Sequence, residues 1–316
     1  MNGKIIFRFD ASIIIGAGHA IRSMVLANRF KELDWHVRIA TNLDSYNFIP
    51  NLRFFERIDQ SNLLDGTSSC DILVIDSYDI DEQVEAQFRK HAKKIVVIDD
   101  LANRSHDCDI LIDQTYGRLE SDYKNLVPEN CQILTGSNYV MLRSEFIQYR
   151  RKALEKRKKT KIINRVLITM GGSDPKNYSE IALKELVEAG FNGEVDIVAG
   201  FKENTIDSIN HLIKSVNNKI KVHVNPNMPK LMYEADLSIG ASGSSVWERC
   251  YLGLPSVLYL TADNQNFFYQ TFINREICYS KNMLRTVLKT PYQLLSKVDN
   301  YCDGLGISRV IKNILF

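Results

Sequence analysis

Several features that mark common protein classes are missing from this chain of 316 residues. Its formal net charge is only +2 at pH 7, whereas proteins that bind nucleic acid or a membrane surface normally carry a strongly basic balance. No apolar run reaches the roughly 18 residues of a membrane-spanning helix, and the first residues run straight into a strand pattern without a signal region. These absences predict a cytoplasmic protein with neither nucleic acid nor a stable membrane association among its partners.

The chain also lacks the motifs of metal centres and of activated nucleophiles. Its six cysteines are scattered, and without a C-x-x-C pair they indicate neither a zinc site nor a thioredoxin-like site. There is no G-x-S-x-G, H-E-x-x-H or Walker loop, and no histidine pair at helical ligand spacing. Five isolated histidines, His36, His91, His106, His211 and His223, are expected to be structural or solvated.

Apolar, mostly β-branched runs recur through the first half of the chain, and helical patterns lie between several of them. Strands with almost no polar alternation, separated by helices, are typical of a parallel sheet covered on both faces. Four of these runs end in a carboxylate at the predicted carboxyl edge, where sites form, although an Asp there is also an ordinary helix cap. The predicted strands are 4–10, 36–40, 71–76, 94–99 and 110–113, the helices are 20–33 and 81–91, and the acids are Asp10, Asp76, Asp99 and Asp113.

The segment 150–161 is the clearest break in composition, because it holds many basic side chains and almost no core residues. It predicts a solvated helix or linker rather than a phosphate-binding or membrane-binding patch. A typical domain size of about 150 residues then suggests a first domain of residues 1–150, a basic linker of 151–161 and a second domain of 162–316.

The second half repeats the strand and helix alternation of the first. Together the halves predict an α/β protein with two Rossmann-like, doubly wound domains that face each other across a cleft, which is the default ligand site. The predicted strands are 165–170, 194–199, 220–224, 237–240 and 255–260, and the helices are 178–189, 204–215, 229–235 and 244–252.

A glycine-rich turn places His19 in the first turn of a helix, directly after the first predicted strand. The spacing Gly16-Ala17-Gly18-His19 is not the dinucleotide fingerprint, because Ile21 stands where the third glycine would be. An imidazole titrates near neutrality, and a helix N-terminus disfavours its charged form, so a neutral base at the ligand edge is predicted. The alternative left open is that His19 caps or packs locally.

Two loops in the second half have the features of phosphate-binding loops. Glycines let the backbone approach a ligand closely, and the free amides of a helix N-terminus favour a diphosphate. Glu248, one turn into the second helix, is placed to accept hydrogen bonds from both ribose hydroxyls of a nucleotide. Helix capping by the serines and a surface role for Glu248 remain open. The loop residues are Gly171, Gly172, Ser242, Gly243, Ser244 and Ser245.

Motifs spread over nearly the whole chain carry a resemblance to a known family. They are Gly16-Ala17-Gly18-His19-x-x-Arg22, Asp76-Ser77-Tyr78, Ile98-Asp99-Asp100, Cys108-Asp109-Ile110-Leu111-Ile112, Gly136-x-x-Tyr139-x-x-Leu142-Arg143-x-x-Phe146, Met170-Gly171-Gly172-Ser173-Asp174 and the serine-rich loop before Glu248. In this order the chain resembles UDP-sugar enzymes of GT-B architecture. More narrowly, it resembles the UDP-2,4-diacetamido-2,4,6-trideoxy-β-L-altropyranose hydrolases of pseudaminic acid biosynthesis.

The resemblance implies that His19 is the catalytic histidine, that the second domain holds UDP, and that water replaces UDP at the anomeric carbon with inversion. It implies that neither a metal nor another cofactor is required. UDP is a good leaving group, so one base and a stabilised diphosphate suffice where ordinary glycosidases need two carboxylates. The residues that it assigns to substrate binding are Gly16, Gly18, Arg22, Asp76, Tyr78 and Asp99.

Other functions stay open at this point. A glycosyltransferase of the same fold would move the sugar to an acceptor instead of water. A hydrolysing 2-epimerase would need further acids at the sugar, and a non-catalytic nucleotide-sugar binding subunit would have no use for a base at the anomeric carbon. The expected partner is a UDP-sugar, and the expected oligomeric state is a monomer.

Overall fold

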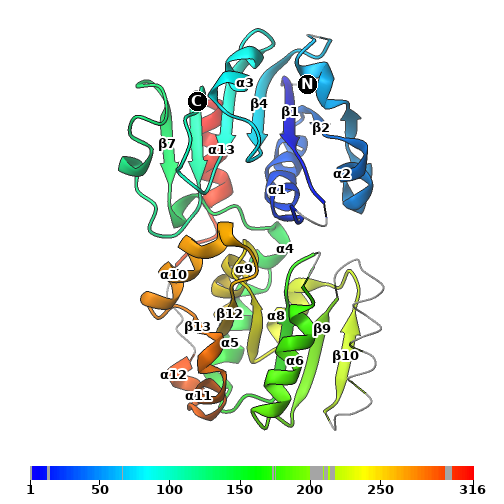
Figure 1. Ribbon diagram of the computed structural model, residues 1–316, viewed down its shortest axis with the longest axis vertical. Helices are drawn as coiled ribbons and strands as arrows, with labels where there is room; N and C mark the ends of the chain where they lie inside the picture. Colours follow the sequence, from blue (N-terminus) through cyan, green and yellow to red (C-terminus); the bar gives the residue numbers. More distant parts are fainter. Residues whose placement is uncertain are drawn as a thin grey trace. The chain divides into compact units, whose positions relative to one another are not determined.

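The chain forms two compact units, each built on one parallel β-sheet (Figure 1). The computed structural model describes residues 2–12, 15–65, 67–172, 174, 176–199, 209, 213, 218–295 and 301–316. The first unit combines Met1–Met141 with the returning segment Gly304–Phe316, and the second unit is Leu142–Asp303. The prediction of two doubly wound α/β domains is therefore confirmed.

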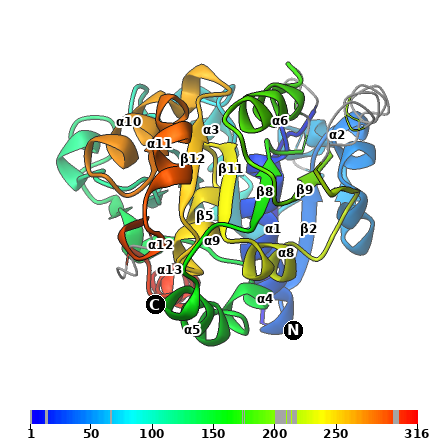
Figure 2. The same cartoon turned by 90° about the horizontal axis from the view of Figure 1, so that it is seen from below.

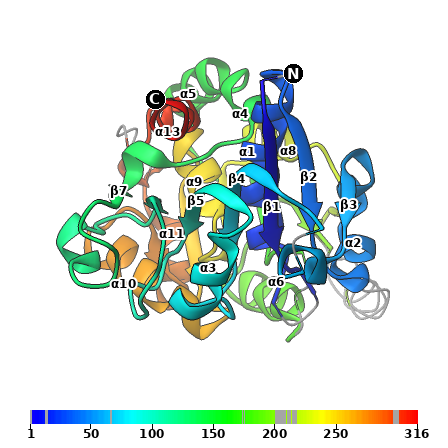
Figure 3. The same cartoon turned by 90° about the horizontal axis from the view of Figure 1, so that it is seen from above.

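The sheet of the first unit has seven parallel strands in the order β3-β2-β1-β4-β5-β6-β7. Helices α1 and α13 pack on one face through the core that contains Phe7 and Phe30, and α3 covers the other face through Phe88 (Figure 3). The strands are β1 (Lys4–Phe9), β2 (His36–Ala40), β3 (Glu56–Ile58), β4 (Cys70–Asp76), β5 (Ala92–Ile98), β6 (Ile110–Asp113) and β7 (Gln132–Thr135). The helices are α1 (Gly18–Glu32), α2 (Leu43–Phe48), α3 (Glu82–Phe88) and α13 (Gly306–Leu315), with 3-10 turns η1 (Pro50–Phe54), η2 (Gln60–Leu63), η3 (Glu120–Tyr123) and η4 (Ser137–Tyr139).

The sheet of the second unit has six parallel strands in the order β10-β9-β8-β11-β12-β13. Helices α6 and α11 pack on one face, and α8 and α9 lie on the other (Figure 2). The strands are β8 (Arg165–Thr169), β9 (Glu194–Val198), β10 (Ile220–His223), β11 (Leu237–Ala241), β12 (Ser256–Tyr259) and β13 (Tyr279–Ser280). The helices are α4 (Ser144–Ile147), α5 (Arg150–Lys159), α6 (Tyr178–Glu188), α8 (Met228–Glu234), α9 (Ser245–Tyr251), α10 (Asn266–Asn274), α11 (Leu284–Lys289) and α12 (Tyr292–Leu295), with 3-10 turns η5 (Asp263–Gln265) and η6 (Lys281–Met283).

All ten predicted strands are present, with ends that differ by at most two residues. The sequence does not predict β3, β7 and β13, which are short edge strands with partly exposed side chains. Short runs of this kind carry little apolar signal. The predicted helix 204–215 and the isolated His211 lie outside the described residues.

The basic segment belongs to the second unit as helix α5 rather than forming a linker, which corrects the expected boundary at residues 151–161. Its charges cap a neighbouring helix. Arg157 is 2% exposed and donates to the Met232 and Ala235 carbonyls at 2.6 and 2.5 Å, while Lys156 donates to the Glu234 and Ala235 carbonyls. These are the last carbonyls of α8, which have no partner inside the helix, and cations there also complement the helix dipole.

The C-terminal helix α13 packs in the first unit, so the predicted second domain of 162–316 is too long. Gly306 permits this packing, because a Cβ there would lie 2.2 Å from the Val140 carbonyl oxygen. At the other end of the helix, Lys94 Nζ donates to the Ile314 carbonyl at 2.6 Å. Local composition does not reveal that a C-terminal helix packs against residues so far away in the sequence. Across the residues that the structure describes, no helix has the length and apolar character needed to cross a membrane.

Candidate functional site

Four acids follow or end four neighbouring strands of the first sheet. Asp10, Asp76, Asp99 and Asp113 stand at the carboxyl ends of β1, β4, β5 and β6, which are adjacent in that order. The carboxyl ends of parallel strands share one edge, so the predicted alignment of these acids is confirmed. This edge is where ligands bind in open α/β sheets.

A tight turn between β1 and α1 brings His19 to the same edge. Ser12 and Gly16 form an isolated antiparallel bridge, in which the Gly16 amide donates to the Ser12 carbonyl at 2.8 Å. Gly16 has a φ of +84°, a conformation that glycine adopts without strain. Gly18 is the first residue of α1, and a Cβ built on it would have no atom within 4 Å. Packing therefore does not explain why a glycine stands at this position. His19 is the second residue of the helix and is 6% exposed.

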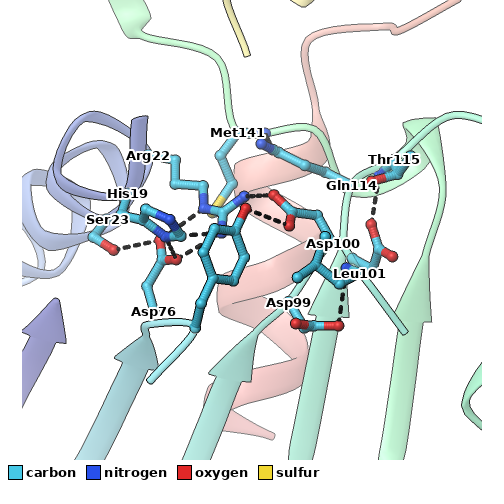
Figure 4. Close-up of polar contacts among 12 residues, drawn as sticks. His19, Arg22, Ser23, Asp76, Asp99, Asp100, Leu101, Gln114, Thr115 and Met141 are labelled. Carbon is cyan, nitrogen blue, oxygen red and sulfur yellow. Dashed lines mark hydrogen bonds and ion pairs between the residues drawn. The ribbon is translucent and has the colours of Figure 1, made fainter. Parts of the chain in front are cut away.

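The Nδ1 atom of His19 makes a very short contact with Asp76 Oδ1 (Figure 4). Arg22 Nη2 also approaches Nδ1, at 3.2 Å, but the carboxylate oxygen is the nearer atom. Asp76 is ionised, because its pKa is lowered, and a carboxylate oxygen only accepts hydrogen bonds, so Nδ1 carries the proton and donates it. In the neutral form of the ring, this tautomer leaves the lone pair on the other nitrogen, Nε2.

Asp76 is surrounded by donors from one face of α1. Arg22 donates from Nε to Oδ2 at 2.7 Å and from Nη2 to Oδ1 at 2.6 Å, and the Ser23 hydroxyl donates to Oδ2 at 3.0 Å. His19, Arg22 and Ser23 share this face because they are spaced three and four residues apart. Burial alone would raise the pKa of Asp76, but the charge of Arg22 and the hydrogen bonds from Arg22 and His19 outweigh it and hold the pKa well below its ordinary range.

A second carboxylate, Asp100, completes what we call the His19 cluster: His19, Arg22, Ser23, Asp76, Tyr78 and Asp100. Arg22 Nη1 donates to Asp100 Oδ2 at 2.6 Å, and the Tyr78 hydroxyl donates to Asp100 Oδ1 at 2.8 Å. The Tyr78 ring packs edge-on against His19, with centroids 4.5 Å apart. Burial lowers the pKa of Arg22, but Asp76 and Asp100 more than reverse this, so the guanidinium is firmly charged.

Asp99 belongs to a different set of contacts. It is 1% exposed and accepts hydrogen bonds from Arg104 at 2.8 Å, from the Tyr123 hydroxyl at 2.8 Å and from the Leu101 and Ala102 amides. The Tyr123 hydroxyl oxygen also lies 2.8 Å from Asp113 Oδ2, and burial raises the pKa of Asp113. Asp99 therefore holds the loop after β5 in place, and its neighbour Asp100 is the acid in the His19 cluster.

In the second unit, Glu248 lies on α9 and is 8% exposed. Arg143 Nε donates to Glu248 Oε1 at 2.7 Å, and the Arg143 guanidinium stacks 4.8 Å from the Phe146 ring. Burial raises the pKa of Glu248, and the Arg143 charge opposes the shift only in part. The acid is thus neither a surface residue nor unpaired, and Arg143 fixes its carboxylate.

The loop before α9 is only partly available to a ligand. Ser242 is 1% exposed; its amide donates to the Tyr259 carbonyl at 3.1 Å, and its hydroxyl donates to Gln265 Oε1 at 3.0 Å. Ser242 therefore ties the loop to β12 and η5. Gly243, Ser244 and Ser245 follow as the entry to the helix, where the first amides have no partner within the helix.

The Gly171-Gly172 loop follows β8, and Gly171 has a φ of +91°. Asp174 occupies the start of the next helix, because its carboxylate accepts the Tyr178 and Ser179 amides at 2.7 and 2.9 Å. An acid at this position takes the place that a phosphate would have at the N-terminus of α6. If this loop binds phosphate, the contacts therefore have to come from Gly171 and Gly172.

Three residues of these sites were not among the sequence-predicted candidates. Ser23 was detectable, because it lies one helical turn after His19. Asp100 follows Asp99 in the same motif, and only the local turn decides which of the two faces His19. Arg143 lies 105 residues before Glu248, and no local pattern links them.

Comparison with known proteins places the chain near enzymes of sugar nucleotides. No protein-family model matches it. It is 29% identical over 299 residues to the uncharacterized protein MJ1062 of Methanocaldococcus jannaschii, covering 91% of this chain but 59% of MJ1062, so it spans about three-fifths of that relative. It is 28% identical over 287 residues to the UDP-2,4-diacetamido-2,4,6-trideoxy-beta-L-altropyranose hydrolase of Campylobacter jejuni, covering 90% of this chain and 94% of the hydrolase.

Among solved structures, the crystal structure of Acinetobacter baumannii MurG matches over 98% of each chain with a TM-score of 0.66 and 13% identity. At this identity the likeness establishes the fold alone. Two parallel, doubly wound units with this topology define the GT-B fold, and that prediction is confirmed.

Proposed function

We propose that this protein is a hydrolase that cleaves a UDP-linked sugar to the free sugar and UDP, with inversion at the anomeric carbon. The observation that carries the proposal is the contact of His19 Nδ1 with the buried Asp76 carboxylate. It leaves Nε2 as a hydrogen-bond acceptor at the carboxyl edge of the sheet, which is the state that a general base requires.

In the proposed reaction, His19 Nε2 accepts a proton from a water molecule while the water oxygen bonds to the anomeric carbon. The bond between that carbon and the diphosphate oxygen breaks, and its electron pair leaves with UDP. Asp76 holds the ring in one tautomer and stabilises the imidazolium that forms. Attack from the face opposite UDP inverts the configuration.

UDP is assigned to the second unit. Glu248, fixed by Arg143, is proposed to accept the ribose hydroxyls, and the entry to α9 together with Gly171 and Gly172 is proposed to hold the diphosphate. Ser242 then acts by fixing the loop, because its amide and hydroxyl are already bonded.

The sugar is proposed to be a 2,4-diacetamido-2,4,6-trideoxy hexose and the route pseudaminic acid biosynthesis. This part rests on the similarity to the Campylobacter jejuni hydrolase, which extends over 90% of the present chain and 94% of that protein. The sequence motifs around His19, Arg22, Asp76 and Tyr78 support it. In this proposal Arg22 and Asp76 act on His19, so contacts to the sugar come from other groups at the same edge.

A glycosyltransferase of the same fold is the second candidate, because the structure of a glycosyltransferase from Rickettsia africae matches 98% of this chain with a TM-score of 0.56 and 12% identity. A base at the anomeric carbon serves an acceptor hydroxyl as well as it serves water. A non-catalytic binding subunit is disfavoured, since it has no use for a histidine held in one tautomer by a buried acid.

The deciding experiment incubates the purified protein with UDP-linked acetamido sugars and follows UDP release without any acceptor. The hydrolase proposal expects multiple turnovers to free sugar and UDP. Release that begins only when a second sugar or lipid acceptor is added would establish the transferase instead. Binding of UDP-sugar without release under either condition would leave the binding subunit.

A further inference from the structure

Arg249 is a buried arginine that lies beneath the loop before α9. It is fully buried, and its guanidinium donates from Nη2 to the Ala241 carbonyl at 2.5 Å and from Nε to the Ser245 carbonyl at 3.3 Å. One side chain thus joins the two ends of the 241–245 loop. The third nitrogen, Nη1, is buried and has no hydrogen-bond partner among the described residues.

The position of Nη1 also relates Arg249 to the other loop. Gly240 and Thr169 are paired at the ends of β11 and β8, two strands that lie side by side in Figure 2. A Cβ on Gly240 would lie 2.5 Å from Arg249 Nη1 and 2.5 Å from the Thr169 carbonyl oxygen. Gly240 therefore leaves the room that Nη1 occupies, at the point where the chain leaves both strands toward Gly171 and Ser242.

Among the residues that the structure describes, no ion pair includes Arg249, and the nearby charge of Glu248 offsets its burial only in part. The adjacent acid, Glu248, is paired with Arg143 instead. Burial accordingly lowers the pKa of Arg249. A buried guanidinium with an unpaired N–H and no ion-paired carboxylate is costly, and the cost falls when an anion binds nearby.

We propose that Arg249 is the positioning residue of the diphosphate site: it fixes the 241–245 loop from below and supplies the positive charge that a bound diphosphate neutralises. This inference rests on the proposed function, because it takes the ligand of that loop to be a nucleoside diphosphate. Because Nη1 is enclosed, Arg249 does not contact the ligand directly. Its positive charge and its hold on the 241–245 loop should therefore affect binding of the phosphates and not of the nucleoside.

The test compares Arg249→Met, Arg249→Lys and Arg285→Met by calorimetric titration with UDP, uridine and inorganic pyrophosphate. Arg285 is exposed and donates to the Glu188 carbonyl, so its variant removes the same charge from the same unit away from the site. Arg249→Met is expected to raise the dissociation constants of UDP and pyrophosphate by about 10- to 100-fold, while the dissociation constant of uridine stays within about twofold of the wild-type value. Arg249→Lys should recover most of the loss, and Arg285→Met should match the wild type.

Equal losses of affinity for UDP and for uridine would mean that Arg249 only supports the loop, and would overturn the proposal. Unchanged UDP binding by a folded Arg249→Met protein would overturn it as well. If the Met variant does not fold, the wild-type protein still decides, because pyrophosphate must displace UDP and raise the melting temperature; its failure to do so overturns the proposal. A wild-type protein that binds UDP and pyrophosphate but releases no UDP from any UDP-sugar would remove the hydrolase assignment and leave the role of Arg249 intact.

Discussion

Arg22 binds both oxygens of the Asp76 carboxylate, with Nε 2.7 Å from Oδ2 and Nη2 2.6 Å from Oδ1. The same carboxylate accepts the Nδ1 proton of His19. Asp76 therefore orients the histidine while its own charge is already balanced by an arginine. Such an acid fixes the tautomer of the ring without acting as the only counter-charge to it.

The first prediction concerns His19 itself. His19→Asn keeps a side chain able to bond Asp76 but removes the lone pair at the Nε2 position. We expect kcat for UDP release to fall by about 10²- to 10⁴-fold, the usual contribution of a general base, with UDP affinity nearly unchanged. His36→Asn is the matched control, since His36 is a half-exposed residue of the same unit that pairs with Glu56. Activity of His19→Asn within a few-fold of the wild type would remove the base assignment.

The second prediction concerns the tautomer. Asp76→Asn presents an amide that can place its NH₂ group toward Nδ1, so the ring proton moves to Nε2 and the base is lost. We expect kcat to fall by about 100-fold or more, as in catalytic triads where the orienting Asp is replaced by Asn. Steady-state kinetics should be corrected for the folded fraction measured by circular dichroism. Full activity in a folded Asp76→Asn protein would show that another group sets the tautomer.

The third prediction is a pH dependence of stability. The pKa of Asp76 is held well below its ordinary value by Arg22 and His19 despite burial, so its ionised form is favoured by folding. Its stabilising contribution is therefore fully present above the unfolded value of about 3.9 and is lost as the pH falls through the lower folded value. Asp76→Asn should lower the free energy of unfolding by about 3 kcal/mol at pH 7, because a buried arginine loses a partner.

Urea unfolding of both proteins at pH 7 and at pH 3 measures this difference, which should shrink at the lower pH. Asp71→Asn is a control, because Asp71 is a partly exposed acid of the same unit that pairs with the exposed Lys93. A gap between wild type and Asp76→Asn that stays constant with pH would mean that the packing of the side chain, and not its charge, stabilises the unit.

Sequence reading captured the elements that have strong apolar runs and missed what depends on distant parts of the chain. The strands β1, β4, β5 and β6 were found with their terminal acids because buried parallel strands read as continuous apolar runs. The His19 turn was found because glycine spacing is local. The return of α13 to the first unit was not predictable, since the packing of Gly306 against Val140 joins residues far apart in sequence.

The same limit applied to the charges of the site. The composition of 150–161 predicts solvated basic residues, but Arg157 is buried because it donates hydrogen bonds to carbonyls at the end of α8. Arg143 and Glu248 could be named separately, and only the fold pairs them. A strand-end acid can equally shape its own loop, as Asp99 does, or reach a neighbouring helix, as Asp76 does, and the sequence does not distinguish these outcomes.

The fourth prediction concerns the nucleotide. Glu248→Gln should weaken UDP binding by roughly 1 to 3 kcal/mol, because the ribose hydroxyls lose a charged acceptor at a buried position. The binding of uridine should weaken by a similar amount, since the contact is to the ribose. Glu145→Gln is a close control, because Glu145 lies 3.7 Å from the same Arg143 but is half exposed. An unchanged dissociation constant for Glu248→Gln by calorimetry would assign Glu248 to holding Arg143 alone.

The fifth prediction identifies the bond that breaks. With one base and a diphosphate site, water is expected to attack the anomeric carbon, so in ¹⁸O-labelled water the heavy oxygen should appear in the sugar and not in UDP. Nuclear magnetic resonance should show the inverted anomer first, before it equilibrates in solution, and a chelator should leave the rate nearly unchanged. Mass spectrometry of both products locates the label. Heavy oxygen in UDP would mean attack at phosphorus, and neither the sugar hydrolase assignment nor the role given to His19 would survive that result.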